Sequence, residues 1–236
     1  MEVKQKTFFE KKVAHNHAVL CSSFMDKKIR TPGQARSRQR VATIIETARQ
    51  LIGEKGVDGV SMREIAQASG VQIGSLYQYF PGKSQLLLTI MQGYYDRLYD
   101  ETRAILENVN TISELEFASE KALKKYIHTS QSDPALANLW AGLRAVPELV
   151  NEDNKDTYRN AELMMKTVIR CLGGLRESEV RPFALYFCHT IGYIIHFAAE
   201  INPEHGKAVI RESRKVLRLR LQAFQEISNL RKKRRK

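Results

Sequence analysis

The sequence predicts an all-α protein, with a small N-terminal three-helix domain followed by a larger helical domain. Three observations support this fold class. Apolar residues recur every three or four positions along most of the chain, the spacing of one face of an α-helix. No alternating run of β-branched residues is long enough to form a sheet. A turn centred on a glycine joins two short helical segments within residues 61–80, and this marks the small domain.

The helical period is clear in five segments, which are separated by residues that commonly end helices. The segments span residues 41–52, 87–106, 158–172, 183–197 and 209–224. The interruptions are Gly53 to Gly59, Pro81-Gly82, Asp133-Pro134, Gly173-Gly174 and Asn202-Pro203. Because glycine and proline favour turns, we expect helices of roughly 8 to 25 residues between these breaks.

The breaks divide the chain into four parts. Residues 1–35 are polar and aperiodic and end in Thr31-Pro32-Gly33, so we expect a basic arm without regular structure. Residues 36–83 hold the helices of the small domain, and residues 84–228 form the larger helical domain. Residues 229–236 end in consecutive basic residues, which we expect to form a solvated tail.

The positive charge lies at the two ends of the chain. The net charge at pH 7 is +12, of which residues 1–83 contribute +7 and residues 226–236 contribute +5. The charge is −2 over residues 84–110 and +2 over residues 111–225, so the middle is nearly neutral. This asymmetry is typical of a unit that contacts nucleic acid joined to a domain with another task.

The cysteines indicate neither a disulfide framework nor a metal centre. Their number is odd and they are widely spaced, at Cys21, Cys171 and Cys188, which fits a reducing cytosol. His15 and His17 lie near Cys21, but no fourth ligand is apparent. We therefore expect no metal and no cofactor.

The hydropathy pattern indicates neither a membrane span nor a signal peptide. The longest apolar stretch, from Tyr186 to Ile201, is interrupted by His189, His196 and Glu200. The N-terminus has basic residues but no continuous apolar stretch before a cleavage site. We therefore expect a cytoplasmic protein.

The most informative pattern lies within residues 61–80. Ser61 is followed three residues later by Glu64, the spacing of a capping box, which predicts the start of a short helix. Gly70 can adopt a positive φ, which ends this helix and turns the chain. A second short helix follows, from Ile73 to Phe80. Two short helices joined in this way form a helix-turn-helix, whose second helix enters the major groove of DNA.

The polar residues of the second helix suit contacts with DNA. Gln72, Ser75 and Gln78 can donate to and accept from base edges. Tyr77, Tyr79 and Lys83 can reach phosphates. The residues that we expect to contact DNA are Arg38, Arg40, Ser61, Arg63, Gln72, Ile73, Gly74, Ser75, Tyr77, Gln78, Tyr79 and Lys83. The alternative is an ordinary αα-hairpin with a capped helix.

The order of motifs across residues 37–90 is specific. It comprises Ser61-Met62-Arg63-Glu64-Ile65-Ala66, Gly70-Val71, Leu76-Tyr77-Gln78-Tyr79-Phe80 and Lys83-Ser84-Gln85-Leu86-Leu87. This order resembles the TetR (tetracycline repressor) family of transcriptional regulators. The rest of the chain is similar only in being helical and of suitable length. The N-terminal arm and the basic tail depart from the family's common core.

The resemblance implies a homodimeric repressor that binds a palindromic operator in double-stranded DNA. The two reading helices would face half-sites roughly 34 to 36 Å apart. The resemblance also implies dimerisation through the last two long helices, here about residues 177–200 and 204–228. One apolar stripe comprises Phe183, Phe187, Ile191, Ile194 and Phe197, and off it lie Tyr186, Gly192 and Tyr193. The alternative is a wide core stripe within one subunit.

The resemblance further implies a small-molecule effector in the C-terminal domain. Such a pocket should be mostly apolar, with a few placed polar groups. The candidates are Tyr126, Trp140, Arg144, Met164, Met165, Phe183, Phe187 and His189, and for each one a core role is the alternative. Their aromatic and Met character favours an apolar or aromatic effector. Such an effector would release DNA by favouring a conformation whose DNA-binding domains do not fit the operator.

Three other classes of protein are alternatives to this interpretation. An enzyme is disfavoured because no paired carboxylates, Walker loop, Ser-His-Asp order or CxxC motif is present. An architectural protein that coats DNA would bind all sequences alike at matched salt. A regulator of the same fold could instead activate transcription or respond to a protein partner.

Overall fold

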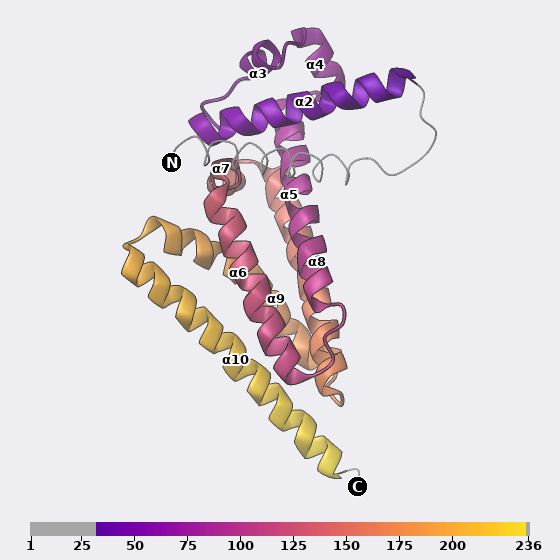
Figure 1. The fold of residues 1–236 in the computed structure, drawn as a ribbon, viewed down its shortest axis with the longest axis vertical. Helices are drawn as coiled ribbons and strands as arrows, with labels where there is room; N and C mark the ends of the chain where they lie inside the picture. Colours follow the sequence, from indigo (N-terminus) through magenta and orange to yellow (C-terminus); the bar gives the residue numbers. More distant parts are fainter. Residues whose placement is uncertain (1–31, 235–236) are drawn as a thin grey trace, which may run out of the picture. The chain divides into compact units, whose positions relative to one another are not determined.

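The computed structural model describes residues 32–234, with side chains for residues 35–143 and 145–234 (Figure 1). This range contains no strand, which confirms the all-α expectation. The helices are α2 (Pro32–Lys55), α3 (Met62–Ala68), α4 (Ile73–Tyr79), α5 (Lys83–Leu106), α6 (Ile112–Ser132), α7 (Pro134–Gly142), α8 (Pro147–Leu172), α9 (Glu177–Glu200) and α10 (Pro203–Arg234), with a 3-10 turn at Leu143–Ala145. His15, His17 and Cys21 lie outside the described residues.

The described residues form two compact units. The first unit contains the residues up to Leu98 together with Pro134–Leu149, and the second contains Tyr99–Asp133 together with the residues from Val150 onward. Helix α7 therefore belongs to the first unit, although the chain reaches it only after α6.

The first unit is built around α2. Its apolar face, with Ile44, Ala48 and Ile52 fully or almost fully buried, packs against the core that α3 and α4 complete. Helices α3 and α4 lie on one side of α2, and α7 lies on the other (Figure 1). We call α2, α3 and α4, residues 32–79, the head.

Helix α2 begins earlier than the sequence pattern predicted. The helical period of the sequence begins at residue 41, whereas α2 starts at Pro32 and so includes Arg36, Arg38 and Arg40. Proline is favoured in the first turn of a helix, because its fixed φ suits the helix and its missing N–H would have no partner there. Pro32 and Gly33, which resemble a turn signal in the sequence, are therefore the first residues of α2.

The turn between α3 and α4 forms as predicted, but the capping box is only half formed. Gly70 has a φ of 68°, and its neighbour Val71 donates its amide to Ala66 O at 3.0 Å. Ser61 Oγ accepts from the Glu64 amide at 3.2 Å, as expected for an N-cap. The Glu64 carboxylate pairs with Lys55 instead of returning to the Ser61 amide. This ion pair lowers the pKa of Glu64 and raises the pKa of Lys55.

The second unit is a helical bundle of α6, α8, α9 and α10 with the end of α5. Its core joins α8, α9 and α10 through residues such as Met165, Val180 and Phe224, all of them fully buried. The apolar stripe of α9 is only partly buried, and its members Phe183 and Phe187 pack against this core. The fully or almost fully buried residues of α9 are Val180, Ala184 and Ile195, whereas Phe197 is 52% exposed.

One described helix, α9, is long and apolar enough to cross a membrane by length and composition. We expected His189, His196 and Glu200 to make this stretch too polar for a membrane span, but α9 still meets the criterion. Only 11% of its most apolar window is buried. A helix this apolar and this exposed needs a covering partner, which we take up below.

The basic C-terminal residues up to Arg234 continue a helix, although Lys232, Lys233 and Arg234 are exposed as expected for a solvated segment. Helix α10 continues to Arg234, and two of its last cations bind the end of α8 and the start of α9. Arg231 forms two hydrogen bonds with the Glu179 carboxylate, at 2.6 and 2.8 Å. Lys232 Nζ donates to Leu172 O at 2.8 Å, and Ser228 Oγ donates to the same carbonyl at 2.8 Å. The like-charge block is tolerated because specific acceptors lie beside it.

Glu179 should make the stability of the second unit depend on pH. Hydrogen bonds from Arg231, and then from the Arg176 amide, hold the pKa of Glu179 far below its ordinary value of 4.5. A depressed pKa contributes stability above the unfolded value, and this contribution is lost as the pH falls below it. We expect Glu179→Gln to lower the free energy of unfolding at pH 7, by a margin that shrinks below pH 4.5.

Urea unfolding of the wild type and the variant between pH 3 and 7 would measure this margin. Glu226→Gln is the matched control, because Glu226 is exposed on α10 and has no ion pair with the described residues. A margin that stays constant down to pH 3 would contradict the assignment.

Candidate nucleic-acid interface

Helix α4 packs one face against the core of the head and exposes the other face to solvent. Leu76 points into the core and is fully buried. Most of the expected contact residues are exposed, and the most exposed apolar ones are Tyr77 at 47% and Ile73 at 42%. Gln72, Gly74 and Gln78 are also exposed, whereas Ser75 is half-buried. The short helix thus displays a mixed polar and aromatic surface.

The two glutamines of this surface are unengaged. Gln72 is the N-cap residue of α4, but its side chain makes no capping hydrogen bond. Neither Gln72 nor Gln78 forms a side-chain hydrogen bond to the described residues, so both amide groups can bind an external partner. A carboxamide can donate and accept at once, which is the pattern that adenine presents in the major groove.

Gly74 leaves the backbone of α4 open to close approach. A Cβ built at this position would meet nothing within 4 Å. No other part of the described chain fills the space beside Gly74. The surface of a partner can therefore approach the α4 backbone more closely here than beside a residue with a side chain.

Tyr79 is held within the head rather than offered to phosphate. Its hydroxyl accepts from Ser37 Oγ at 3.2 Å, and its ring is half-buried. This contact ties the N-terminal part of α2 to the last turn of α4. It thereby fixes the part of α2 that carries exposed Arg40 and half-buried Arg38. Sequence reasoning missed Ser37, because its partner lies 42 residues away.

The remaining expected contacts differ in their surroundings. Arg63 is exposed on the first turn of α3, and Lys83 is half-buried at the start of α5. Ser61 is exposed, but its hydroxyl already caps α3, so only its other hydrogen-bonding positions are available. Of the phosphate contacts expected, Arg63, Tyr77 and Lys83 therefore suit that role better than Tyr79.

The expected effector residues do not form one group. Trp140 lies in the first unit, where its Nε1 donates to Tyr95 Oη at 3.2 Å. Met165 is fully buried in the core of the second unit. His189 is exposed on α9, with its Nδ1 3.4 Å from Thr157 Oγ1. The side chain of Arg144 lies outside the described residues.

A group of half-buried polar side chains does lie within the second unit. Burial, followed by the charges of Asp156 and Asp153, raises the pKa of Tyr126 well above its ordinary value. Burial likewise raises the pKa of the Cys188 thiol to about 12. Cys188 Sγ lies 4.0 Å from Met164 Sδ, so two of the expected residues, Tyr126 and Met164, are grouped around this cysteine. Phe183 and Phe187 stack on each other along α9, with ring centroids 5.8 Å apart.

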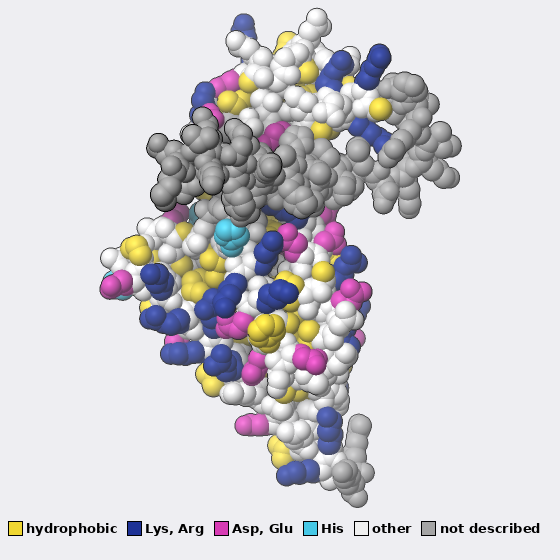
Figure 2. Space-filling model, viewed as in Figure 1, with side chains coloured by type: hydrophobic (Ala, Val, Ile, Leu, Met, Phe, Trp, Pro, Cys, Tyr) yellow, Lys and Arg dark blue, Asp and Glu magenta, His cyan; other side chains and the backbone are white. Residues whose placement is uncertain are grey.

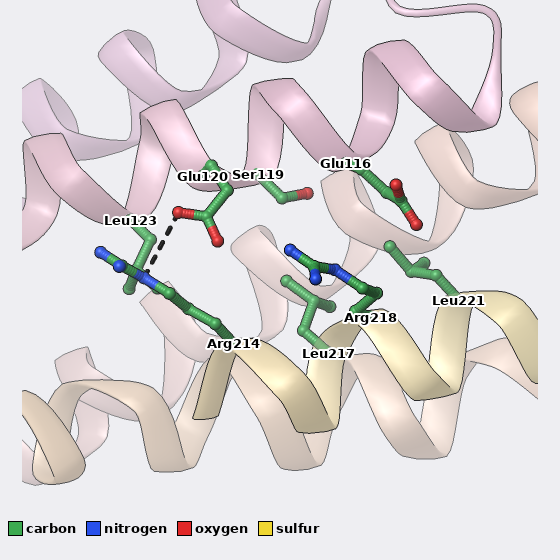
Figure 3. A pocket seen from close by; sticks show the side chains of 8 residues that line it. All are labelled: Glu116, Ser119, Glu120, Leu123, Arg214, Leu217, Arg218 and Leu221. Carbon is green, nitrogen blue, oxygen red and sulfur yellow. Dashed lines mark ion pairs between the residues drawn. The ribbon is translucent and has the colours of Figure 1, made fainter. Parts of the chain in front are cut away.

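A shallow groove lies between α6 and α10, away from the expected effector residues (Figure 3). Leu123, Leu217 and Leu221 form its apolar part, and its rims carry opposite charges. Arg214 of α10 pairs with Glu120 of α6 at 3.3 Å. Lys and Arg side chains gather over the same two helices on the face drawn in Figure 2. Because carboxylates already neutralise part of this charge, we do not regard the groove as the effector site.

No group of three or more His, Cys, Asp or Glu side chains with metal-binding geometry occurs within residues 32–234.

Two family models match the chain. The model for bacterial regulatory proteins of the tetR family matches residues 44–90. The model for the tetracyclin repressor-like C-terminal domain matches residues 113–225. Together they cover the head from residue 44 onward, the start of α5 and most of the second unit.

Two curated relatives each match about a third of the chain or less. The transcriptional repressor KstR2 of Mycobacterium tuberculosis is 30% identical over 79 residues, which is 34% of this chain and 38% of that protein. The uncharacterized regulator YuxN of Bacillus subtilis is 39% identical over 62 residues, 26% of this chain and 21% of that protein. The matches thus span well under half of these relatives.

Solved structures match most of the fold. A TetR-family regulator from Streptomyces coelicolor has a TM-score of 0.61 at 22% identity, covering 78% of this chain and 99% of that chain. The fatty acid degradation regulator FadR from Bacillus halodurans has a TM-score of 0.57 at 20% identity, covering 80% and 96%. At these identities the likeness shows a shared fold.

Proposed function

Because this chain belongs to the tetR family of bacterial regulatory proteins, and so is a DNA-binding transcriptional regulator rather than an enzyme, we propose its mode of action. It acts as a homodimeric repressor that binds a palindromic operator through residues 72–79. A small apolar or aromatic effector, bound in the second unit, releases it from DNA. Its place of action is the cytoplasm, where the operator lies.

The exposed surface of α4 is the observation that carries this proposal. Leu76 anchors the helix, and the unengaged carboxamides of Gln72 and Gln78 face outward beside Gly74. Direct reading of base edges needs such groups on a rigid, narrow element that fits the major groove. Arg63, Tyr77 and Lys83 flank them and supply the phosphate contacts that fix the register.

The exposed apolar faces of α9 and α10 support a homodimer. The large apolar residues exposed on these two helices are Tyr186, Tyr193, Phe197, Val216, Leu219 and Leu230. The two helices pack closely on each other, so these residues belong to one helical pair. A symmetric dimer buries the same patch on both subunits, which would give this pair a matching cover and place two heads on one operator.

The effector is the finer part of the proposal. Tyr126, Met164 and Phe187 provide a mostly apolar environment with one hydroxyl, which suits an apolar molecule with few polar groups. Two structural neighbours are named for such molecules, FadR for fatty acid degradation and AlkX for the biodegradation of n-alkanes. These functions belong to those proteins, and here they support only the chemical class.

Selection of bound duplexes from a random pool tests the proposal. We expect enriched sequences with two inverted half-sites whose centres are about one helical turn, roughly 34 Å, apart. A pool that shows no enrichment at matched salt would indicate a protein that coats DNA instead. A single, non-repeated motif would indicate a monomeric reader and would contradict the dimer.

Substitutions in α4 should separate base reading from phosphate binding. We expect Gln72→Ala and Gln78→Ala to cost about 10-fold on the selected operator and little on random DNA, because a lost base contact removes discrimination. Lys83→Ala should weaken binding to all sequences and reduce the dependence on salt. Fluorescence anisotropy with both DNAs at several salt concentrations measures the difference. Equal losses on both DNAs for the glutamine variants would place the reading surface elsewhere.

A further inference from the structure

The last turns of α2 are capped by a residue from a distant part of the chain. Asn138 Nδ2 donates to Ile52 O at 2.7 Å and to Gly53 O at 3.3 Å, and 86 residues separate Asn138 from Ile52. Ile52 O also accepts from the Gly56 amide at 2.9 Å, so Asn138 adds a second donor there and reaches Gly53 O, one of the final carbonyls that have no partner within the helix. Sequence reasoning had assigned no role to Asn138.

Two glycines allow α2 and α7 to approach each other. A Cβ at Gly53 would lie 3.4 Å from Ala135 N, and a Cβ at Gly142 would lie 3.2 Å from the Val57 side chain. Neither glycine has a positive φ, so neither is required by its backbone conformation. The Gly142 contact is the tight one, because a side chain there would press on Val57, the second residue after α2, whereas the contact at Gly53 is an ordinary van der Waals distance.

Two adjacent tyrosines of α5 extend the same connection. Tyr94 Oη accepts from Arg49 of α2 at 3.1 Å, and Tyr95 Oη accepts from Trp140 of α7 at 3.2 Å. Leu136 and Leu139 of α7 are fully buried. Helices α2, α5 and α7 are therefore joined by hydrogen bonds and by a common apolar core within one compact unit.

We propose that α7 is a working part of the DNA-binding head and that Asn138 is a positioning residue for operator binding. Helix α7, which carries Asn138, lies on the side of α2 away from α3 and α4 (Figure 1), so Asn138 acts by holding the end of α2 rather than by touching DNA. The chain enters α7 from α6, which carries Tyr126, and leaves it for α8, which carries Met164.

This inference rests on the proposed function, and an isosteric substitution tests it in the full-length chain. Asn138→Asp keeps the shape but removes the donor, and it places a carboxylate against two carbonyls at the negative end of a helix. We expect faster amide hydrogen exchange over residues 52–60 and about 10-fold weaker binding to the selected operator, a size typical of coupling between sites. The helical circular dichroism should stay unchanged.

The matched control is Asn110→Asp. The Asn110 side chain also donates to a backbone carbonyl, Asn108 O at 3.0 Å, but it lies in the second unit. Exchange and affinity in this control should equal those of the wild type. Asn138→Gln retains the donor and should recover part of the affinity.

A second variant keeps the inference open to refutation if Asn138→Asp unfolds. Gly142→Ala adds one methyl group against Val57, and it should raise exchange over residues 52–60 in the same way. Wild-type exchange and affinity in either folded variant would overturn the role of α7. If the wild type itself selects no DNA sequence, the proposed function fails, and the exchange measurement still reports on the contact.

Discussion

Replacing one exposed apolar residue on α9 or α10 by glutamate should turn the dimer into a monomer and lower operator affinity about 100-fold or more. Phe197 is 52% exposed and Leu219 is 64% exposed, so neither side chain is needed to fold its own subunit. A carboxylate within a symmetric apolar interface is buried twice without a partner, which is strongly unfavourable. Each monomer would then bind a half-site independently. It would lose the increase in affinity that arises when two linked heads bind the two half-sites of one operator.

Sedimentation velocity and anisotropy with the palindromic operator measure these two effects in Phe197→Glu and Leu219→Glu. Phe117→Glu is the control, because Phe117 is 74% exposed on α6, outside the α9–α10 pair. It should remain dimeric and bind the operator as the wild type does. A dimeric Phe197→Glu or Leu219→Glu protein would show that the subunits meet through another surface.

Truncating Leu76 should abolish DNA binding through the loss of the head's core. Leu76 is fully buried and joins α4 to the rest of the head. Replacing a buried leucine by alanine typically costs about 2–5 kcal/mol, because the methyl groups lose their contacts and a cavity remains. We expect Leu76→Ala to destabilise the first unit by about 3 kcal/mol and to remove sequence-specific binding.

Hydrogen exchange resolved along the chain distinguishes this loss from general unfolding. Protection should fall over residues 62–80 and stay high in the core of α8 and α9. Ile73→Ala, three residues earlier in the same helix, is the matched control for burial, because Ile73 is 42% exposed. It should change stability little and affect only DNA binding. Equal destabilisation by the two variants would contradict the orientation of α4.

Local signals predicted the head because its geometry is fixed by near neighbours. Gly70 needs a positive φ whatever surrounds it, and Ser61 caps the amide three residues ahead. The same reasoning failed where a distant residue competes. Glu64 could return to the Ser61 amide, but Lys55 offers a charge, and sequence spacing does not rank these two partners.

The second unit shows where periodicity stops being informative. Helix α9 is apolar on more than one face, so the period shows that it is a helix but not which face is buried. Packing against α8 and α10 selects Val180 and Ala184 for the core and leaves Phe197 outside. Contacts such as Asn138 to Ile52 and Arg231 to Glu179 have no local signal at all, because their partners are 86 and 52 residues apart.

The last turn of α10 has a practical consequence for handling this protein. Arg231 donates to Gly174 O and Lys232 donates to Leu172 O, so the last described turn of α10 holds the loop between α8 and α9. A chain shortened after Leu230 would lose the Arg231 donor to Gly174 O and the Lys232 donor to Leu172 O, leaving only the Ser228 hydroxyl at Leu172 O. Purification handles are therefore better placed at the other terminus.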